Sequence, residues 1–302
     1  MQTFYSHGKL LISSEYAVLD GAQALALPTK FGQKLKVEST SGNLIHWKSI
    51  SNCGKIWFET HFNIGEALKI TCNDNSKIAL RLLQVLESLQ QLNPNIFTRK
   101  TGFKITSKLE FPENWGLGSS STLINNLAQW GRVDAFRLLN LTFGGSGYDI
   151  ACAQNKTAIL YQLSRGIPSI SPVKFKPKFS NQLFFIHRNK KQNSRDGVEA
   201  YKKSTKYKIV DFNKLNKLTL EILNSQNIEI FKKSIETHET YIGSLLQEPT
   251  LKQSLFSDYQ GEIKSLGAWG GDFFLATGDL SSMEYFKIKG YQTILSFSEM
   301  IL

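Results

Sequence analysis

The sequence has 302 residues, of which 41% are hydrophobic and 20% are charged, the proportions of a globular protein with a large buried core. No apolar run is long enough to span a bilayer, and the N-terminus lacks the basic-then-apolar layout of a secretory signal. We therefore expect a cytoplasmic protein without a membrane partner. The cysteines, Cys53, Cys72 and Cys152, are scattered and odd in number, which argues against a disulfide framework.

The formal net charge is +11, from 36 basic and 25 acidic residues. Such an excess attracts polyanions, so nucleic-acid binding competes with a phosphate-handling enzyme as an interpretation. The basic residues cluster only over 188–195 and 202–208, and aromatic residues are not interleaved with them as in a base-stacking surface. We expect an enzyme and no nucleic-acid partner.

The first half of the chain predicts strands and amphipathic helices. Apolar residues recur at helical spacing from Ile78 to Leu92, with Asn75 or Ser76 as the cap. From Phe103 to Phe111 apolar and polar residues alternate, which predicts a strand with one wet face. The elements expected in this half are strands over 31–37, 44–48, 55–61 and 103–111, and helices over 78–92 and around 123–130.

The second half predicts a different order of elements. A strand at Leu183–His187 leads into a basic loop, and helical spacing follows in three stretches. The mixture predicts the α+β class, with a boundary near residue 165 and domains over 1–165 and 166–302. The elements expected in this half are helices near 196–207, 212–224 and 227–247, a glycine-rich turn at 267–271, and strands at 273–276 and 293–297.

A glycine-rich turn joins the strand ending at Phe111 to the next helix. It contains Gly-Leu-Gly-Ser-Ser-Ser from Gly116 to Ser121. Glycines let the backbone approach a ligand, and the first-turn N–H groups of a helix have no internal partner and carry a positive potential. This arrangement favours an anion site, with phosphate as the usual occupant, although an ordinary helix cap explains the same residues.

Four segments, taken together, resemble the GHMP kinases, the family of galactokinase, homoserine kinase, mevalonate kinase and phosphomevalonate kinase. Pro112–Ser120 is similar to the second conserved motif, Pro-x-x-x-Gly-Leu-Gly-Ser-Ser. Gly8–Gly21 resembles the first motif, and Leu266–Asp272 resembles the third. Gly144–Ala151 looks like the segment that holds the catalytic Asp in mevalonate and phosphomevalonate kinases.

The resemblance implies a GHMP kinase fold and a set of roles. The fold would have an N-terminal ribosomal-protein-like α/β half that binds ATP and a C-terminal ferredoxin-like α+β half on the substrate side. Asp149 would accept the substrate hydroxyl proton, and Lys9 would lie beside it. Ser120 would help to hold Mg²⁺. The residues expected to bind the nucleotide are Gly116, Leu117, Gly118, Ser119, Ser120, Ser121, Glu15, Gly267, Gly270 and Gly271.

Substrate choice rests on the basic loop after the strand Leu183–His187. Its residues suit a carboxylate or a phosphate, and a solvated loop is the alternative. We expect phosphorylation of a small anionic metabolite, mevalonate or phosphomevalonate, in isoprenoid precursor synthesis. A diphosphomevalonate decarboxylase-like enzyme, a non-catalytic ligand-binding protein and an RNA-binding protein stay open, as does a homodimer. The residues expected to contact the substrate are Arg188, Lys191, Ser194 and Arg195.

The chain departs from the family pattern at several places. Asn114 and Trp115 replace the small residues that precede Gly-Leu-Gly in the second motif. Ser14 stands where glycine usually precedes the first-motif Glu15, and Trp269 stands where the third motif has glycine. Mevalonate kinases also carry a Mg²⁺-binding Glu about a dozen residues before the catalytic Asp, whereas 136–148 contains no acid here. A second metal ligand is therefore not identified from the sequence.

Overall fold

The computed structural model describes residues 1–190, 194–203, 210–267, 269 and 271–302, apart from the side chains of 194–196 and 200. The chain forms two compact units. Unit 1 consists of Met1–Gly8, Phe31–Glu113 and Gly118–Gln154, and unit 2 of Lys9–Lys30, Asn114–Leu117 and Asn155–Leu302. Because these segments interleave, the predicted domains 1–165 and 166–302 stay a prediction.

Unit 1 contains a mixed sheet in the order β5-β4-β3-β6-β2. Strands β3 and β6 run parallel, and the other neighbouring pairs run antiparallel. Strands β1 and β2 contribute residues to both units, and β1 pairs with β2. The strands are β1 (Gln2–Leu11), β2 (Ala24–Ser41), β3 (Leu44–Ile50), β4 (Ile56–Ile64), β5 (Ile70–Cys72) and β6 (Thr101–Leu109).

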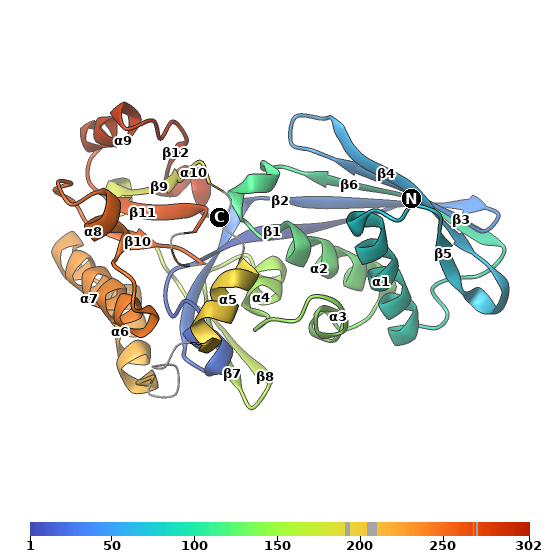
Figure 1. Cartoon of the computed structure of the whole chain (residues 1–302), viewed down its shortest axis with the longest axis horizontal. Coiled ribbons are helices and arrows are strands. Elements are labelled where there is room, and N and C mark those ends of the chain that lie inside the picture. Colours follow the sequence, from blue (N-terminus) through green and yellow to red (C-terminus); the bar gives the residue numbers. More distant parts are fainter. Residues whose placement is uncertain (191–193, 204–209, 268, 270) are drawn as a thin grey trace. The chain divides into compact units, whose positions relative to one another are not determined.

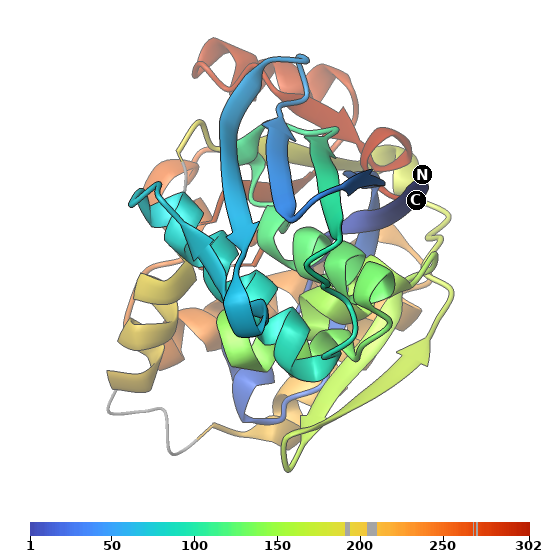
Figure 2. The ribbon, with the colours of Figure 1, turned by 90° about the vertical axis from the view of Figure 1, so that its right-hand side faces the viewer.

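The helices of unit 1 lie on one face of this sheet, as both Figure 1 and Figure 2 show. Ser76, one of the two predicted caps, begins the first helix, because its Oγ accepts a hydrogen bond from the Ala79 N–H at 3.2 Å. The helices are α1 (Lys77–Leu92), α2 (Ser119–Gly131), α3 (Ala135–Thr142) and α4 (Tyr148–Gln154).

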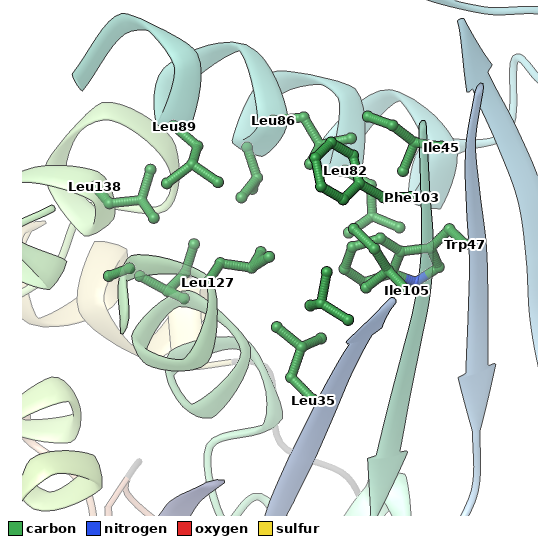
Figure 3. Close-up of a cluster of buried hydrophobic side chains, with 14 of the residues drawn as sticks. Leu35, Ile45, Trp47, Leu82, Leu86, Leu89, Phe103, Ile105, Leu127 and Leu138 are labelled. Atoms are coloured by element: carbon green, nitrogen blue, oxygen red, sulfur yellow. The ribbon is translucent and has the colours of Figure 1, made fainter. Parts of the chain in front are cut away.

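The core of unit 1 follows from the two periodicities of the sequence. Leu82, Leu86 and Leu89 project from one face of α1 toward the sheet (Figure 3). Trp47 of β3 and Ile105 of β6 point from the sheet toward them, while the alternate residues of these strands face solvent. The helical and period-two patterns of the sequence therefore meet in one buried cluster.

Unit 2 contains an antiparallel sheet in the order β10-β11-β9-β12, with α6 and α7 packed together beside it (Figure 1). Strand β9 has the predicted bounds. The elements of this sheet and its helices are β9 (Leu183–His187), β10 (Ile263–Ser265), β11 (Phe273–Thr277), β12 (Ile294–Ser296), α5 (Ser194–Lys203), α6 (Phe212–Asn224), α7 (Ile228–Leu246), α8 (Leu251–Leu255), α9 (Glu284–Ile288) and α10 (Phe297–Met300).

A hairpin that the sequence did not predict also belongs to unit 2. Strand β7 (Ile159–Ser164) pairs with β8 (Ile167–Pro172) and with the first residues of β2. The two residues that join β7 to β8, Arg165 and Gly166, have φ values of +50° and +79°, as a tight two-residue hairpin turn requires. Strand β8 tolerates its prolines because it lies at the end of the sheet.

The strand predicted over 31–37 is the middle of the longer strand β2, which begins seven residues earlier. The other predicted elements are present with shifts of a few residues at their ends. Helix α5 begins at Ser194 rather than near 196, and the predicted stretch after Lys203 lies outside the described residues. Within the part of the chain that the structure describes, no helix is long and apolar enough to cross a bilayer.

Replacing Leu86 with Ala should lower the free energy of unfolding by about 2–5 kcal/mol, because Leu86 is fully buried and the deletion leaves a cavity. Leu80→Ala on the same helix is the matched control, since Leu80 is 48% exposed, and should change this free energy by about 0.5 kcal/mol or less. Urea titration measures both values. Equal losses in the two variants would contradict the packing of α1.

Candidate active site

The first half of the glycine-rich turn lies against Lys9 in unit 2. The backbone N–H of Lys9 donates to the carbonyl of Leu117 at 3.0 Å, and its side-chain Nζ donates to the carbonyl of Gly116 at 2.8 Å. Lys9 is therefore hydrogen-bonded to the backbone of the turn through both its main-chain N–H and its ammonium group. A positive charge is fixed beside the segment that the sequence predicts to bind phosphate.

Gly116 is required at its position for two reasons. Its φ of +64° lies in the left-handed region, where other residues are strained. In addition, a Cβ at this position would overlap the carboxylate of Asp272, which occupies that space. The carbonyl of Asp272 accepts a hydrogen bond from the N–H of Arg188 at 2.8 Å. Lys9, the turn, Asp272 and Arg188 are thus brought together.

Asn114 and Trp115, which differ from the small residues of the family motif, anchor the turn to the second sheet. The Asn114 carbonyl lies 3.0 Å from Nε2 of His187, at the end of β9. Because a carbonyl can only accept, Nε2 carries the proton, and Nδ1 accepts from the N–H of Asn189 at 3.3 Å. The Trp115 ring packs edge-on against Phe273, with 5.4 Å between ring centroids.

The third glycine-rich segment is joined to the first in unit 2. The N–H of Gly267 donates to the carbonyl of Leu11 at 3.3 Å, and the N–H of Trp269 donates to the hydroxyl of Tyr16 at 2.7 Å. The Trp269 side chain is buried in a cluster with Tyr16 and Leu245, which accounts for a large residue where the family has glycine. Gly271 is buried, and Gly270 lies outside the described residues.

Ser14 adopts the backbone conformation that usually calls for glycine. Its φ is +62°, which costs a residue with a Cβ about 1–2 kcal/mol. The Ser14 N–H donates to Nε2 of His238 at 2.9 Å, and its Oγ donates to the carbonyl of Gln23 at 2.7 Å. These buried bonds hold the unfavourable conformation and explain how serine replaces glycine.

Glu15, which was expected near the nucleotide, is fully buried in unit 2. Its carboxylate pairs with the ammonium group of Lys264. Because the side chain is enclosed and already paired, it makes no direct contact that an incoming nucleotide could use. The predicted role of Glu15 in nucleotide binding stays a prediction, and the structure gives it a place in a buried ion pair.

The second half of the turn begins α2 in unit 1. Gly118 caps this helix with φ +88° and no side-chain hydrogen bond. The Ser121 hydroxyl is turned inward and donates to the Gly118 carbonyl at 2.9 Å, whereas Ser119 is half-buried and Ser120 is exposed. The first-turn N–H groups therefore lack a side-chain acceptor, and the hydroxyl of Ser120 faces solvent, as an anion and metal site needs.

Buried polar residues fix the start of α2, and sequence reasoning missed them. Asn125 Nδ2 donates to Oγ of Ser6, and Ser6 Oγ donates to Oδ1 of Asn126, both at 2.8 Å. Asn126 Nδ2 donates to the carbonyl of Gln33 at 2.9 Å, and Thr122 donates to the side chain of Gln33. The spacing i, i+3, i+4 of Thr122, Asn125 and Asn126 places them on one helix face and was the available signal.

Asp149 lies half-buried in the first turn of α4 in unit 1. Its Oδ1 accepts a hydrogen bond from the Ile150 N–H at 3.0 Å, so the side chain is held at the helix start. The glycines before it include Gly145 and Gly147, with φ values of +107° and +85°. The predicted proximity of Lys9 stays a prediction, because Lys9 belongs to the other unit.

Of the predicted substrate residues, the structure describes the side chain of Arg188 alone. Arg188 follows β9 and is half-buried. Burial lowers its pKa, while Tyr291 and the Asp272 carboxylate act in the opposite direction. Lys191 and the side chains of Ser194 and Arg195 lie outside the described residues.

A surface cavity of about 340 Å³ in unit 2 contains none of these residues. It is lined by polar groups at the end of α7 and around α8, without the convergent charges or glycine-rich backbone of the turn. We therefore place the candidate site at the turn and not in this cavity. The lining residues are Thr240, Gly243, Ser244, Gln247, Glu248, Thr250 and Gln253.

Neither a protein-family model nor a curated protein sequence matches the chain. Solved structures do match. A mevalonate kinase from Methanococcus jannaschii is 17% identical with a TM-score of 0.69, over 97% of this chain and 96% of the other. Streptococcus pneumoniae phosphomevalonate kinase, in complex with phosphomevalonate and AMPPNP, is 16% identical with a TM-score of 0.68, over 98% and 100%.

A third similar structure is the galactokinase of Lactococcus lactis complexed with galactose. It is 14% identical with a TM-score of 0.67, over 98% of this chain and 92% of the other. The chain therefore has the GHMP kinase fold, in the α+β class, as the sequence predicted. Because these kinases act on different acceptors, the fold does not select among them.

Gly116→Ala should destabilise the protein more than Gly166→Ala. Both glycines have positive φ, +64° and +79°, so both variants share the backbone strain. A Cβ at Gly166 meets nothing within 4 Å, whereas one at Gly116 overlaps the carboxylate of Asp272. Thermal or urea unfolding of the two variants measures the difference. A Gly116→Ala variant no less stable than Gly166→Ala would mean that Asp272 does not pack on the turn.

Proposed function

We propose that this protein is an ATP-dependent small-molecule kinase. The observation that carries the proposal is the set of contacts around Lys9. Its ammonium group donates a hydrogen bond to the carbonyl of Gly116, and Asp272 packs against the same glycine and binds the N–H of Arg188. The uncapped first turn of α2 supplies N–H groups from the other half of the same motif. Backbone donors and a fixed cation suit a triphosphate.

In this proposal, each residue of the turn has a role in phosphoryl transfer. The backbone from Gly116 to Ser121 binds the phosphate oxygens, and Lys9 neutralises charge that develops during transfer. The exposed hydroxyl of Ser120 is a hard oxygen ligand that fits Mg²⁺. Mg²⁺, when bound, neutralises and orients the phosphate groups.

Asp149 is the proposed acceptor of the substrate hydroxyl proton. A carboxylate held at a helix start by the Ile150 N–H has a fixed direction, which general-base catalysis needs. As the proton leaves, the hydroxyl oxygen attacks the γ-phosphorus and ADP departs with the bridging oxygen. Phosphoryl transfer depends mainly on this alignment and on charge neutralisation.

We further propose that the acceptor is mevalonate or phosphomevalonate, as part of isoprenoid precursor synthesis. Arg188, placed beside Asp272 at the end of β9, supplies a guanidinium group suited to a carboxylate or phosphate. The first-motif form from Gly8 to Val18 also favours these acceptors. A decarboxylase-like reaction would share the phosphoryl-transfer step and would release CO₂ as well.

The test is ADP release from Mg²⁺-ATP with mevalonate, phosphomevalonate and diphosphomevalonate in parallel. We expect turnover with mevalonate or phosphomevalonate and a loss of about 10²–10⁴-fold in kcat for Asp149→Asn. Asp134→Asn is the matched control, because Asp134 caps α3 in the same unit and Asn preserves a cap. It should keep the wild-type rate.

Three outcomes would count against the proposal in different ways. ATP binding without turnover of any acceptor would indicate a ligand-binding protein. Turnover limited to sugars or amino acids would remove the mevalonate assignment and leave the kinase. CO₂ release with diphosphomevalonate would show the decarboxylase reaction instead.

A further inference from the structure

Four ionisable side chains are buried together in unit 2, away from solvent. Glu15 comes from the turn after β1, His238 and Glu239 come from α7, and Lys264 comes from β10. Their exposed fractions are 0% for Glu15, His238 and Lys264 and 2% for Glu239. Buried charges of this kind are costly unless they are paired, so their arrangement needs a reason.

Lys264 is the centre of the cluster. Its Nζ donates to Oε1 of Glu15, to Oε1 of Glu239 at 2.8 Å and to the carbonyl of Ser265 at 2.7 Å, which uses all of its protons. The other oxygen of each glutamate and Nδ1 of His238 are buried without a hydrogen-bond partner. Two carboxylates thus share one ammonium group, and each keeps one oxygen that could accept a further hydrogen bond.

Glu15, His238 and Glu239 have the spacing of a metal site, with ligand atoms within 4.8 Å of one another. The chemistry of His238 argues against one. Its Nε2 accepts the Ser14 N–H at 2.9 Å, so Nδ1 carries the proton of the neutral ring and has no lone pair for a metal. Lys264 already supplies the cation, which leaves a proton as the species that balances the remaining charge.

The electrostatics of the cluster favour one retained proton. Burial raises the pKa of Glu15 to about 7, with Lys264 opposing and the charge of Glu239 adding to the rise. Burial lowers the pKa of Lys264, but both carboxylates raise it and the net direction is upward, so the ammonium stays charged. Burial, with Lys264, holds the pKa of His238 well below its usual value, so the ring is neutral.

The cluster joins two of the glycine-rich segments around the candidate site. His238 binds the N–H of Ser14 and so supports its left-handed backbone. Lys264 binds Glu15 and lies in β10, the strand that precedes Trp269 and Asp272 in the sequence. That segment meets the first one again where Trp269 binds the hydroxyl of Tyr16. The cluster therefore contacts the two chain segments that carry Lys9 and Asp272.

We propose that His238, Glu239 and Lys264 are positioning residues for Lys9, and that their buried cluster with Glu15 retains one proton. The proposal rests on the proposed function only for the role of Lys9 in catalysis. The groups that face Glu15 are His238, at 3.8 Å from Nδ1 to Oε2, and Glu239 from α7, and Lys264 from β10.

The sign of the pH effect follows from the direction of the Glu15 shift. Its ordinary value of 4.5 applies to the unfolded chain, and the folded value is about 7. Between these values the folded protein retains a proton that the unfolded chain has lost. The contribution of this group to stability is therefore greatest at low pH and is lost as the pH rises toward 7.

The experiment measures the free energy of unfolding of the full chain by urea titration from pH 5 to pH 8. The variants are Glu239→Gln, Glu15→Gln and the control Glu262→Gln, whose carboxylate pairs with Lys252 near the surface at 2.6 Å. Subtracting each variant from the wild type isolates the contribution of the cluster. We expect both cluster variants to remove the fall in stability between pH 5 and pH 7, and Glu262→Gln to leave it in place.

The two cluster variants show whether the retained proton depends on the whole cluster. The charge of Glu239 adds to the rise in the pKa of Glu15, so an intact pH dependence in Glu239→Gln would mean that the cluster does not hold the proton, and the proposal would be wrong on this point. The same holds if the wild type and both variants have parallel profiles. These readouts need no kinase activity, so they test the cluster even if the proposed function fails.

The positioning role has a separate readout. With an active enzyme, Glu239→Gln should lower kcat about 10-fold at pH 7 and change its pH profile, with KM for the acceptor nearly unchanged, and Glu262→Gln should do neither. Lys264→Arg, which keeps the charge, should retain more activity than Lys264→Met. Should Glu239→Gln lose stability and yet keep the wild-type kcat and pH profile, the cluster is structural only and the positioning role is refuted.

Discussion

The hydrogen bond from Lys9 Nζ to the carbonyl of Gly116 is the constraint on which the candidate site depends. It fixes a cation on the backbone of the glycine-rich turn, and Asp272 closes the other side of the same glycine. Leu11, two residues after Lys9, accepts a bond from Gly267 of the segment that leads to Asp272. The segments around Lys9, around Gly116 and from Gly267 to Asp272 are thus each in contact with the other two within unit 2.

The residues that hold these three segments together include several with energetically unfavourable conformations or environments. Ser14 has a left-handed backbone, Gly116 leaves no room for a side chain, and Glu15 and Lys264 are ionisable groups without access to water. Strain and buried charge persist only where surrounding contacts over-determine them, and they gather at functional sites. We therefore interpret the buried cluster and the turn around Lys9 as acting together. Their unfavourable features lower the stability of the folded protein, and their contacts fix the position of Lys9.

The sequence predicted most elements of the fold because their patterns are local. The period-two strand of β6 and the helical stripe of α1 could be identified without a partner. The hairpin β7–β8 could not, because prolines are unusual in a strand and are tolerated here only at the sheet edge. At the site, motif spacing selected Lys9 and Gly116, but Lys264, the ion-pair partner of Glu15, is 249 residues away in the sequence. No spacing rule connects such residues.

Binding of ATP, AMP and adenosine to the wild type and to Lys9→Met, measured by calorimetry with Mg²⁺ present, tests the central claim most directly. If the turn and Lys9 hold the phosphate chain, ATP binds the wild type at least about 100-fold more tightly than adenosine, a difference of about 2.7 kcal/mol, and most of this preference is lost in Lys9→Met. Equal affinity for ATP and adenosine, or a preference for ATP that Lys9→Met leaves intact, would contradict the account.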